Sequence, residues 1–212
     1  MRVWTMPLMT AMLFSLLVTG CAANNIKNLV TRGTAEGGKG WGKTILLCQV
    51  ALPAGSVTNP DKIKDVTTRV EQCLAKAPGV ELVAVEGLRN ALSGREPFGT
   101  SDAELADAAL AAGADTVAVV QVMEYGGDLT ISLVPPCWKV TLDYAYHARI
   151  VDAHTGALYL DAYRGQREGG TFAVRGADKL GEDFKADLAA LLSDTDQDNP
   201  GKDLPAKTGS GS

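Results

Sequence analysis

The sequence lacks a basic excess, histidine-rich stretches and long hydrophobic runs. Its 212 residues carry 20 Lys and Arg against 25 Asp and Glu, a formal net charge of −5. Nucleic-acid-binding domains usually cluster Lys and Arg, so we expect no nucleic-acid partner. Two histidines and four cysteines offer few metal ligands, and we expect no metal or other cofactor. The composition also excludes collagen-like, coiled-coil and multi-span membrane proteins.

The N-terminus is typical of an export signal. Arg2 is a basic start, and residues 8–18 form a mostly apolar run. As a helix this run measures about 16 Å, roughly half of a bilayer core, so it does not span one. The run ends in LVTGC, residues 17–21, which resembles a bacterial lipobox. The resemblance implies that residues 1–20 are a signal peptide and that Cys21 is lipidated on its sulfur and its new amino group.

A lipidated Cys21 predicts attachment to a membrane, because two or three acyl chains anchor a protein stably where one does not. Ala22 and Ala23 follow Cys21. An Asp after the lipidated Cys would indicate retention at the inner membrane, and none is present here. In a bacterium with two membranes this predicts the periplasmic side of the outer membrane. The alternative is an ordinary secretory signal with a chance Cys at this position.

Composition divides the rest of the chain into three parts. Residues 21–43 hold five glycines and little apolar periodicity, which predicts a flexible linker after the lipidated Cys. Residues 194–212 contain Leu204 as their only large apolar residue and predict a disordered tail. The part between them, residues 44–193, then forms a single α/β domain.

Short apolar runs alternate with amphipathic segments in this domain. The predicted strands are residues 44–52, 80–85, 116–123, 138–150 and 157–164; the predicted helices are residues 60–77, 102–112 and 177–191. Strands separated by helices favour parallel pairing, whereas the last two strands form an antiparallel hairpin. The fold class is therefore α/β (mixed α+β): a mixed parallel/antiparallel sheet with a long C-terminal hairpin and helices packed on it.

Two phrases, GADTVAVVQVMEY (residues 113–125) and YHARIVDAHTGALYLDAYRG (residues 146–165), resemble a group of periplasmic lipoprotein domains. The group includes the curli secretion channel lipoprotein, the outer-membrane activators of penicillin-binding proteins and the N-terminal domain of the Tol-system propeller protein. The resemblance covers residues 44–192 and implies this fold, an envelope location, and a role in docking or assembly without catalytic residues. No amphipathic spanning hairpin like those of the curli channel is evident, so we expect no pore.

Two residues of the shared phrases have expected structural roles. We expect Asp115 to hold the entry of its strand, and Gly156 to adopt a left-handed backbone in the hairpin turn.

Three cysteines remain beyond the leader, in a compartment where paired thiols usually oxidise. Cys48 is on the first strand and Cys73 faces inward from the first helix, so these two are candidates for a disulfide. Cys137 is the alternative partner of either, and three unlinked thiols are the remaining alternative.

Residues 37–44, GGKGWGKT, match the phosphate-loop pattern. That chemistry needs a strand before the loop and a helix after it, whereas an apolar β-run follows here. A nucleotide-binding function is therefore the remote alternative, which a helix beginning at Lys43 would favour.

The predicted hairpin carries four tyrosines and two histidines. Tyr144, Tyr146, Tyr159 and Tyr163 are predicted to pack across the strands or to form a docking surface. His147 and His154 are expected at the surface, because no GxSxG or ligand-rich run accompanies them.

We therefore expect a non-enzymatic, lipid-anchored binding or assembly module of a cell-envelope complex, with an envelope protein or another copy of itself as partner. The alternative is an envelope enzyme or small-ligand binder with a cleft at the carboxyl edge of the sheet.

Overall fold

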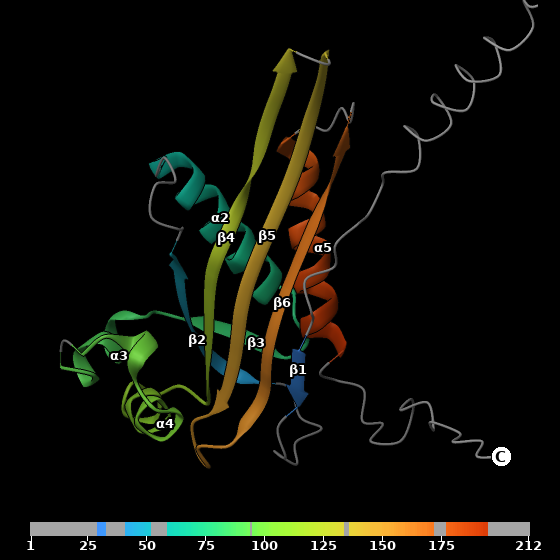
Figure 1. The fold of residues 1–212 in the computed structure, drawn as a ribbon. Coiled ribbons are helices and arrows are strands. Elements are labelled where there is room, and N and C mark those ends of the chain that lie inside the picture. The colour runs from blue at the N-terminus through green and yellow to red at the C-terminus, as the bar shows by residue number, and fades with distance from the viewer. Residues whose placement is uncertain are drawn as a thin grey trace, which may run out of the picture.

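The computed structural model describes residues 29–32, 41–51, 59–93, 95–133, 136–171 and 177–194 (Figure 1). The strands are β1 (Leu29–Arg32), β2 (Gly42–Val50), β3 (Val80–Val83), β4 (Thr116–Leu133), β5 (Pro136–Asp152) and β6 (Leu158–Thr171). The helices are α2 (Pro60–Leu74), α3 (Glu86–Ala91), α4 (Asp102–Ala111) and α5 (Ala177–Asp194), with a 3-10 turn, η1, at Pro97–Gly99. Among these residues, no helix is both long and apolar enough to cross a bilayer.

The strands form one mixed sheet in the order β1-β6-β5-β4-β2-β3. Strand β2 pairs in parallel with β3 and β4, while β5 is antiparallel to both β4 and β6. The predicted mixed α+β fold with its long C-terminal hairpin is confirmed. The apolar run 116–123 also lies mid-sheet, as expected, because β4 has β5 on one side and β2 on the other.

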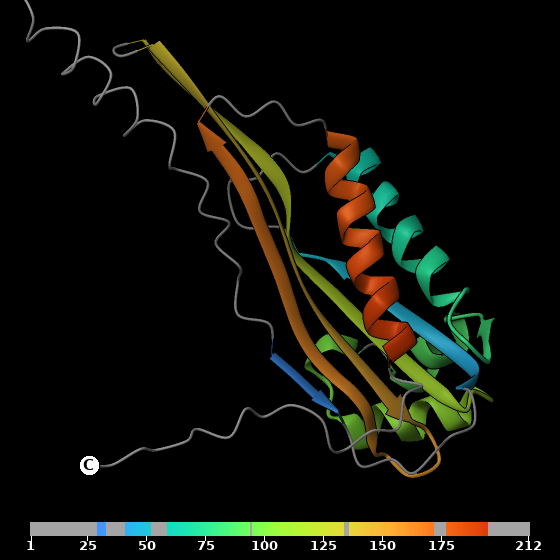
Figure 2. The same ribbon diagram turned by 90° about the vertical axis from the view of Figure 1, so that its right-hand side faces the viewer.

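Helices cover both faces of the sheet, and each face has its own core (Figure 2). Helices α2 and α5 pack on one side, here called the α2/α5 face, around Phe184. Helices α3 and α4 cover the opposite α3/α4 face near its lower end, around Leu105. The β4–β5 hairpin extends beyond the helices at the upper end in both views (Figures 1 and 2).

Local sequence signals place the ends of these elements. Asn59 caps α2 through its side chain, and Ser101 forms a capping box with Glu104 at α4. Asp115 accepts a hydrogen bond from the Lys43 backbone N–H at 2.9 Å, which joins the starts of β4 and β2. Gly156 has a φ of +68° in the β5–β6 turn. The expected roles of Asp115 and Gly156 are confirmed.

The structure differs from the predicted linker over residues 21–43 at two places. Leu29–Arg32 form β1, which pairs with β6 because the β6 edge offers unpaired backbone groups. Gly42–Lys43 begin β2 rather than end a linker. Gly42 is required there: its φ is +66°, and a Cβ would lie 2.6 Å from Asp115 Oδ2.

The sheet also holds a hairpin that the sequence analysis did not predict. Strand β4 continues ten residues past Met123 to Leu133 and pairs with β5 along its whole length. The signal peptide at residues 1–20, the lipidation site Cys21 and the tail after Asp194 lie outside the described residues.

Candidate functional site: a groove at the open edge of β2

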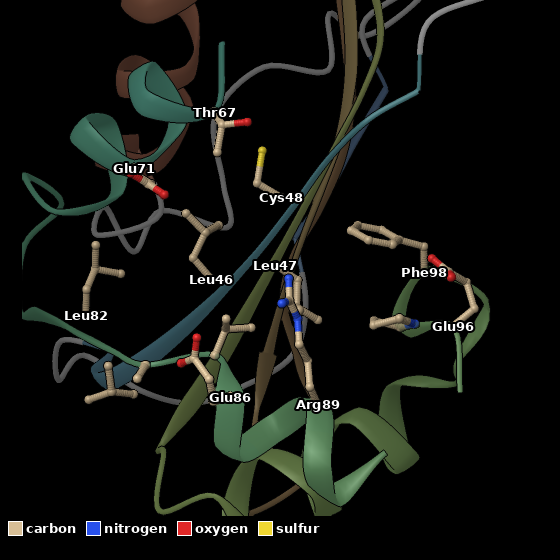
Figure 3. Close-up of a pocket in the computed structure, with 14 residues that line it drawn as sticks. Leu46, Leu47, Cys48, Thr67, Glu71, Leu82, Glu86, Arg89, Glu96 and Phe98 are labelled. Atoms are coloured by element: carbon tan, nitrogen blue, oxygen red, sulfur yellow. The ribbon is translucent and has the colours of Figure 1, made fainter. Parts of the chain in front are cut away.

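A groove of about 630 Å³ lies where β3 ends beside the longer strand β2 (Figure 3). Register pairing between these strands stops at Ile45 with Val83. The chain then turns into α3, while β2 continues to Val50 along β4. The groove is thus a space next to β2 that the short strand β3 leaves open.

The groove exposes one edge of β2. Ala51 N–H donates to Val122 of β4, so by strand alternation the backbone groups of Cys48 and Val50 point away from β4. Gly42 N–H donates to Gly79 on the β3 side, in agreement with this alternation. Among the described residues, no strand pairs with β2 beyond Ile45 on that side. An extended chain could therefore continue the sheet at this edge, as in strand addition.

Both faces of the sheet contribute walls to the groove. Thr67 and Glu71 of α2 line it on the α2/α5 face. Arg89 of α3 and Phe98 of η1 line it on the α3/α4 face, opposite α2 in Figure 3. The groove therefore wraps around the free edge of β2, with one wall on each face of the sheet.

The charges of the lining residues are mostly negative. Three carboxylates line the groove, those of Glu71, Glu86 and Glu96. Arg89 is the one basic side chain among the lining residues. All four side chains belong to exposed residues, so their charges are solvated but still bias the groove towards a basic ligand group.

The thiol in the groove is held in its protonated form. Burial raises the pKa of Cys48 to about 11; the hydrogen bond from Thr67 opposes this shift and the nearby charge of Glu71 adds to it. A thiol with this pKa carries almost no thiolate at neutral pH, and the thiolate is the nucleophile. Cys48 therefore lines the groove as a neutral thiol.

Cys48, Cys73 and Cys137 are free thiols in the structure, which forms none of the three candidate disulfides. Cys73 is buried in α2, and its Sγ lies 3.6 Å from the carbonyl oxygen of Lys185 in α5. Cys137 is half-buried near the hairpin end of β5. The three thiols lie on three different elements, β2, α2 and β5.

The predicted tyrosine docking surface is wrong for Tyr144 and Tyr146. Both are almost fully buried, because α5 covers their face of β5 and Phe184 contacts both rings edge-on at 5.6 and 5.5 Å. Tyr146 also donates a hydrogen bond to Asp187 of α5. Tyr159 is half-buried and donates to Asp152, which leaves only Tyr163 at 36% exposure.

The remaining sequence motifs form no second site. His147 pairs with Asp161 across β5 and β6 at 2.6 Å, and His154 with Asp115 at 3.2 Å, both on half-exposed side chains. Lys43 of the phosphate-loop match lies in β2, a strand and not a helix, so the geometry required for that motif is not met. Across the described ranges, no group of three His, Cys, Asp or Glu could hold a metal ion.

Sequence reasoning missed most of the groove residues. It placed a cleft at the carboxyl edge of the sheet only as an alternative, and the groove does lie at the carboxyl end of β3. The one usable signal was the unequal length of the two apolar runs: the strand at Val80 is much shorter than the strand at Gly42. Arg89 and Phe98 had no such signal, since α3 and η1 are short.

No family model and no curated protein matches this chain. Similar solved structures include the PelC dodecamer from Paraburkholderia phytofirmans, at 15% identity over 79% of this chain and 95% of that one, with a TM-score of 0.42. Another is lipoprotein GNA1162 from Neisseria meningitidis, at 15% identity, 70% and 96% coverage and a TM-score of 0.46. The LpoB C-terminal domain from Salmonella enterica matches at 15% identity, 67% and 88% coverage and a TM-score of 0.37. Bacterial lipoproteins are thus among the structures with a similar arrangement.

Proposed function

We propose that this protein is a non-catalytic lipoprotein that captures an extended segment of a cell-envelope protein. Its signal peptide is removed before Cys21, lipid on Cys21 anchors it on the periplasmic side of the outer membrane, and the sheet from β1 onward, with its helices to the end of α5, forms the binding domain. The support for the anchor is the lipobox at residues 17–21 and the absence of Asp after Cys21. Capture of a partner makes the protein a binding or assembly module of an envelope complex.

The observation that carries the binding role is the open edge of β2 inside the groove. A segment that adds to this edge pairs with the backbone of Cys48 and Val50, which supplies affinity for any sequence. Alternate side chains of the segment then point to the two walls, towards Glu71 on one face and Phe98 on the other. The three lining carboxylates favour a segment that carries Lys or Arg.

The small-ligand alternative has one observation in its favour, the position of the groove at the carboxyl end of β3. Small-molecule sites, however, bury most of their ligand in a closed pocket with a few converging polar groups. This groove is open along the strand edge, and its one thiol is protonated. A chain segment fits this shape better than a metabolite.

Reversal of the groove charge tests the proposal. A random peptide library displayed on phage is selected against the purified protein, and the recovered peptides are expected to carry Lys or Arg. Glu71→Lys together with Glu96→Lys should weaken their binding about tenfold or more, because two favourable charges become repulsive. Fluorescence polarisation of labelled peptides measures the dissociation constants.

The matched control is Asp107→Lys, which makes the same kind of charge reversal on exposed α4 outside the groove lining. It should leave peptide affinity within about twofold, since Asp107 does not line the groove and exposed charges interact weakly in water. Recovered peptides without basic residues, or equal losses in the groove and control variants, would argue against capture at this edge.

A further inference from the structure

The upper end of the β4–β5 hairpin has one apolar face. Four of the large apolar side chains that the fold leaves exposed gather there: Leu129, Ile131, Leu133 and Trp138, at 62%, 65%, 83% and 42% exposure. Ile131 is opposite Trp138 in the strand register, so these side chains lie on one face of the ribbon. We call this set the hairpin apolar face.

This face continues the buried α2/α5 face beyond the helices. Tyr125 packs edge-on against Phe184 in the core, and alternate residues along β4 from Tyr125 lead to Leu129 and Ile131. Figures 1 and 2 both show the hairpin projecting past the ends of α2 and α5. The opposite face of the same ribbon carries Thr130 and Lys139, paired across the strands. The projecting end is therefore an amphipathic ribbon.

We propose that the hairpin apolar face lies in the surface layer of a lipid bilayer, as a second membrane contact beside the lipid on Cys21. The proposal rests on the proposed function for that lipid. Aliphatic side chains together with Trp have the composition of membrane-interface contacts, because the Trp ring has an apolar body and a polar N–H. Lys139 on the other face can keep its ammonium in water while its stem lies along the ribbon.

The chain between Cys21 and β1 is long enough to let this end approach the membrane. Leu29 is opposite Tyr163, and β1 runs away from the hairpin end, so the chain enters β1 from the hairpin side. Cys21 is eight residues before Leu29, a reach of at most about 28 Å. Tyr163 is opposite His147 of β5, and β5 begins at Pro136 at the hairpin end. This end therefore lies eleven residues of strand, about 36 Å, from Tyr163.

A lipid at Cys21 can thus come within about 10 Å of the hairpin end, a gap comparable to the depth of one headgroup region. The lower end of the sheet is also within reach of the tether. The one large apolar side chain that α4 exposes at that end is Leu110. The hairpin apolar face therefore favours contact of the upper end of the sheet with the bilayer.

The ribbon is too short to cross the bilayer. The apolar positions run from Leu129 to Leu133, about 16 Å of strand, whereas a crossing strand needs about 9–11 residues. Unpaired backbone at the β4 edge would also be costly in hydrocarbon. Contact at the interface avoids this cost, since backbone groups there remain hydrated while the side chains enter the acyl boundary.

Trp138 is a native reporter for this contact. The sequence holds three tryptophans, so Trp4→Phe with Trp41→Phe leaves Trp138 as the only one. The full chain, purified from membranes and reconstituted into phosphatidylcholine vesicles, is compared with and without lipids brominated near the headgroup end of the acyl chains. Bromine quenches only nearby indoles, so Trp138 emission should fall at least about twofold, as expected for a ring at the interface.

The control chain carries Trp4→Phe with Trp138→Phe and reports from Trp41, which immediately precedes β2 at the other end of the sheet. Its emission should not change. A second pair of variants separates the two faces: Ile131→Asp should reduce Trp138 quenching to the Trp41 level, and Thr130→Asp, with the same new charge on the polar face, should leave it unchanged.

Trp138 quenching no greater than that of Trp41 would overturn the proposal. So would an equal response to Ile131→Asp and Thr130→Asp, or a loss of self-association with Ile131→Asp in sedimentation, which would assign the face to a second copy. The intact mass of the same preparation reports the lipid on Cys21 separately. Quenching without that lipid contradicts the anchor alone, and the lipid without quenching contradicts the hairpin contact alone.

Discussion

Phe184→Ala lowers the free energy of unfolding by about 4 kcal/mol, the cost of removing a fully buried aromatic ring from a core. Phe184 is 0% exposed and lies in the core between α5 and the sheet. Its ring makes edge-on contacts with three tyrosines, Tyr125, Tyr144 and Tyr146, at centroid distances of 5.5 to 5.6 Å. Each such contact adds about 0.5–1.5 kcal/mol beyond the area buried. The truncation leaves a cavity that three rigid rings cannot fill.

Urea unfolding measures this loss, with Phe98→Ala as the matched control. Phe98 is the same residue type but lies half-buried in η1 at the rim of the groove, so its truncation should cost about 1–2 kcal/mol. Equal losses in the two variants would show that α5 does not pack on β5 as described, and the buried positions of Tyr144 and Tyr146 would then be wrong as well.

Cys21→Ala should abolish lipidation entirely. Without the sulfur there is no acceptor for the diacylglyceryl group, and without that group the signal at residues 1–20 is not removed. The chain should then accumulate as a longer precursor that incorporates no labelled palmitate. Two or three acyl chains supply nearly all of the stable membrane affinity of such an anchor, so the effect is a loss and not a reduction.

The matched control is Cys137→Ala, which removes a different thiol and should leave both label and mobility unchanged. Inhibition of lipoprotein signal peptidase with globomycin should reproduce the accumulated precursor. Retained label in Cys21→Ala, or its loss in Cys137→Ala, would contradict the assignment of the lipid to Cys21.

Local sequence signals predict a large part of this fold. Two helix caps, at Asn59 and Ser101, depend on side chains that accept hydrogen bonds from backbone N–H groups two or three residues further on. The Asp115 side chain accepts a similar hydrogen bond from the backbone of the neighbouring strand. The residue types and their spacing predict such helix caps. The parallel strands and the final hairpin follow from the order of apolar runs, which constrains the topology strongly.

The sequence does not predict the projecting β4–β5 hairpin. Gly126 and Gly127 interrupt the apolar alternation of β4 and are typical of a turn. In the structure Gly127 lies within the strand, opposite Leu142 of β5. Glycine suits this position because a Cβ there would lie 2.7 Å from Leu142 Cδ2. A glycine required by close packing and a glycine required by a turn look identical in one sequence.

The candidate site was less accessible to sequence reasoning than the fold. Alternation showed that Tyr144 and Tyr146 share a face of β5, but not that α5 covers this face. The groove depends on where β3 stops relative to β2, and strand ends are poorly marked in a sequence. Its lining from α2, α3 and η1 comes together only through tertiary packing.

The most direct test of segment capture is site-specific photocrosslinking in intact cells. A photoreactive amino acid replaces Leu82, which lines the groove, or Leu110 on α4, and both positions are exposed. We expect a discrete crosslinked envelope protein from position 82, with a yield that falls about tenfold or more when Glu71→Lys is combined with Glu96→Lys, and none from position 110. The same product from both positions, or an undiminished yield from position 82 in the double variant, would contradict a binding site at the open edge of β2.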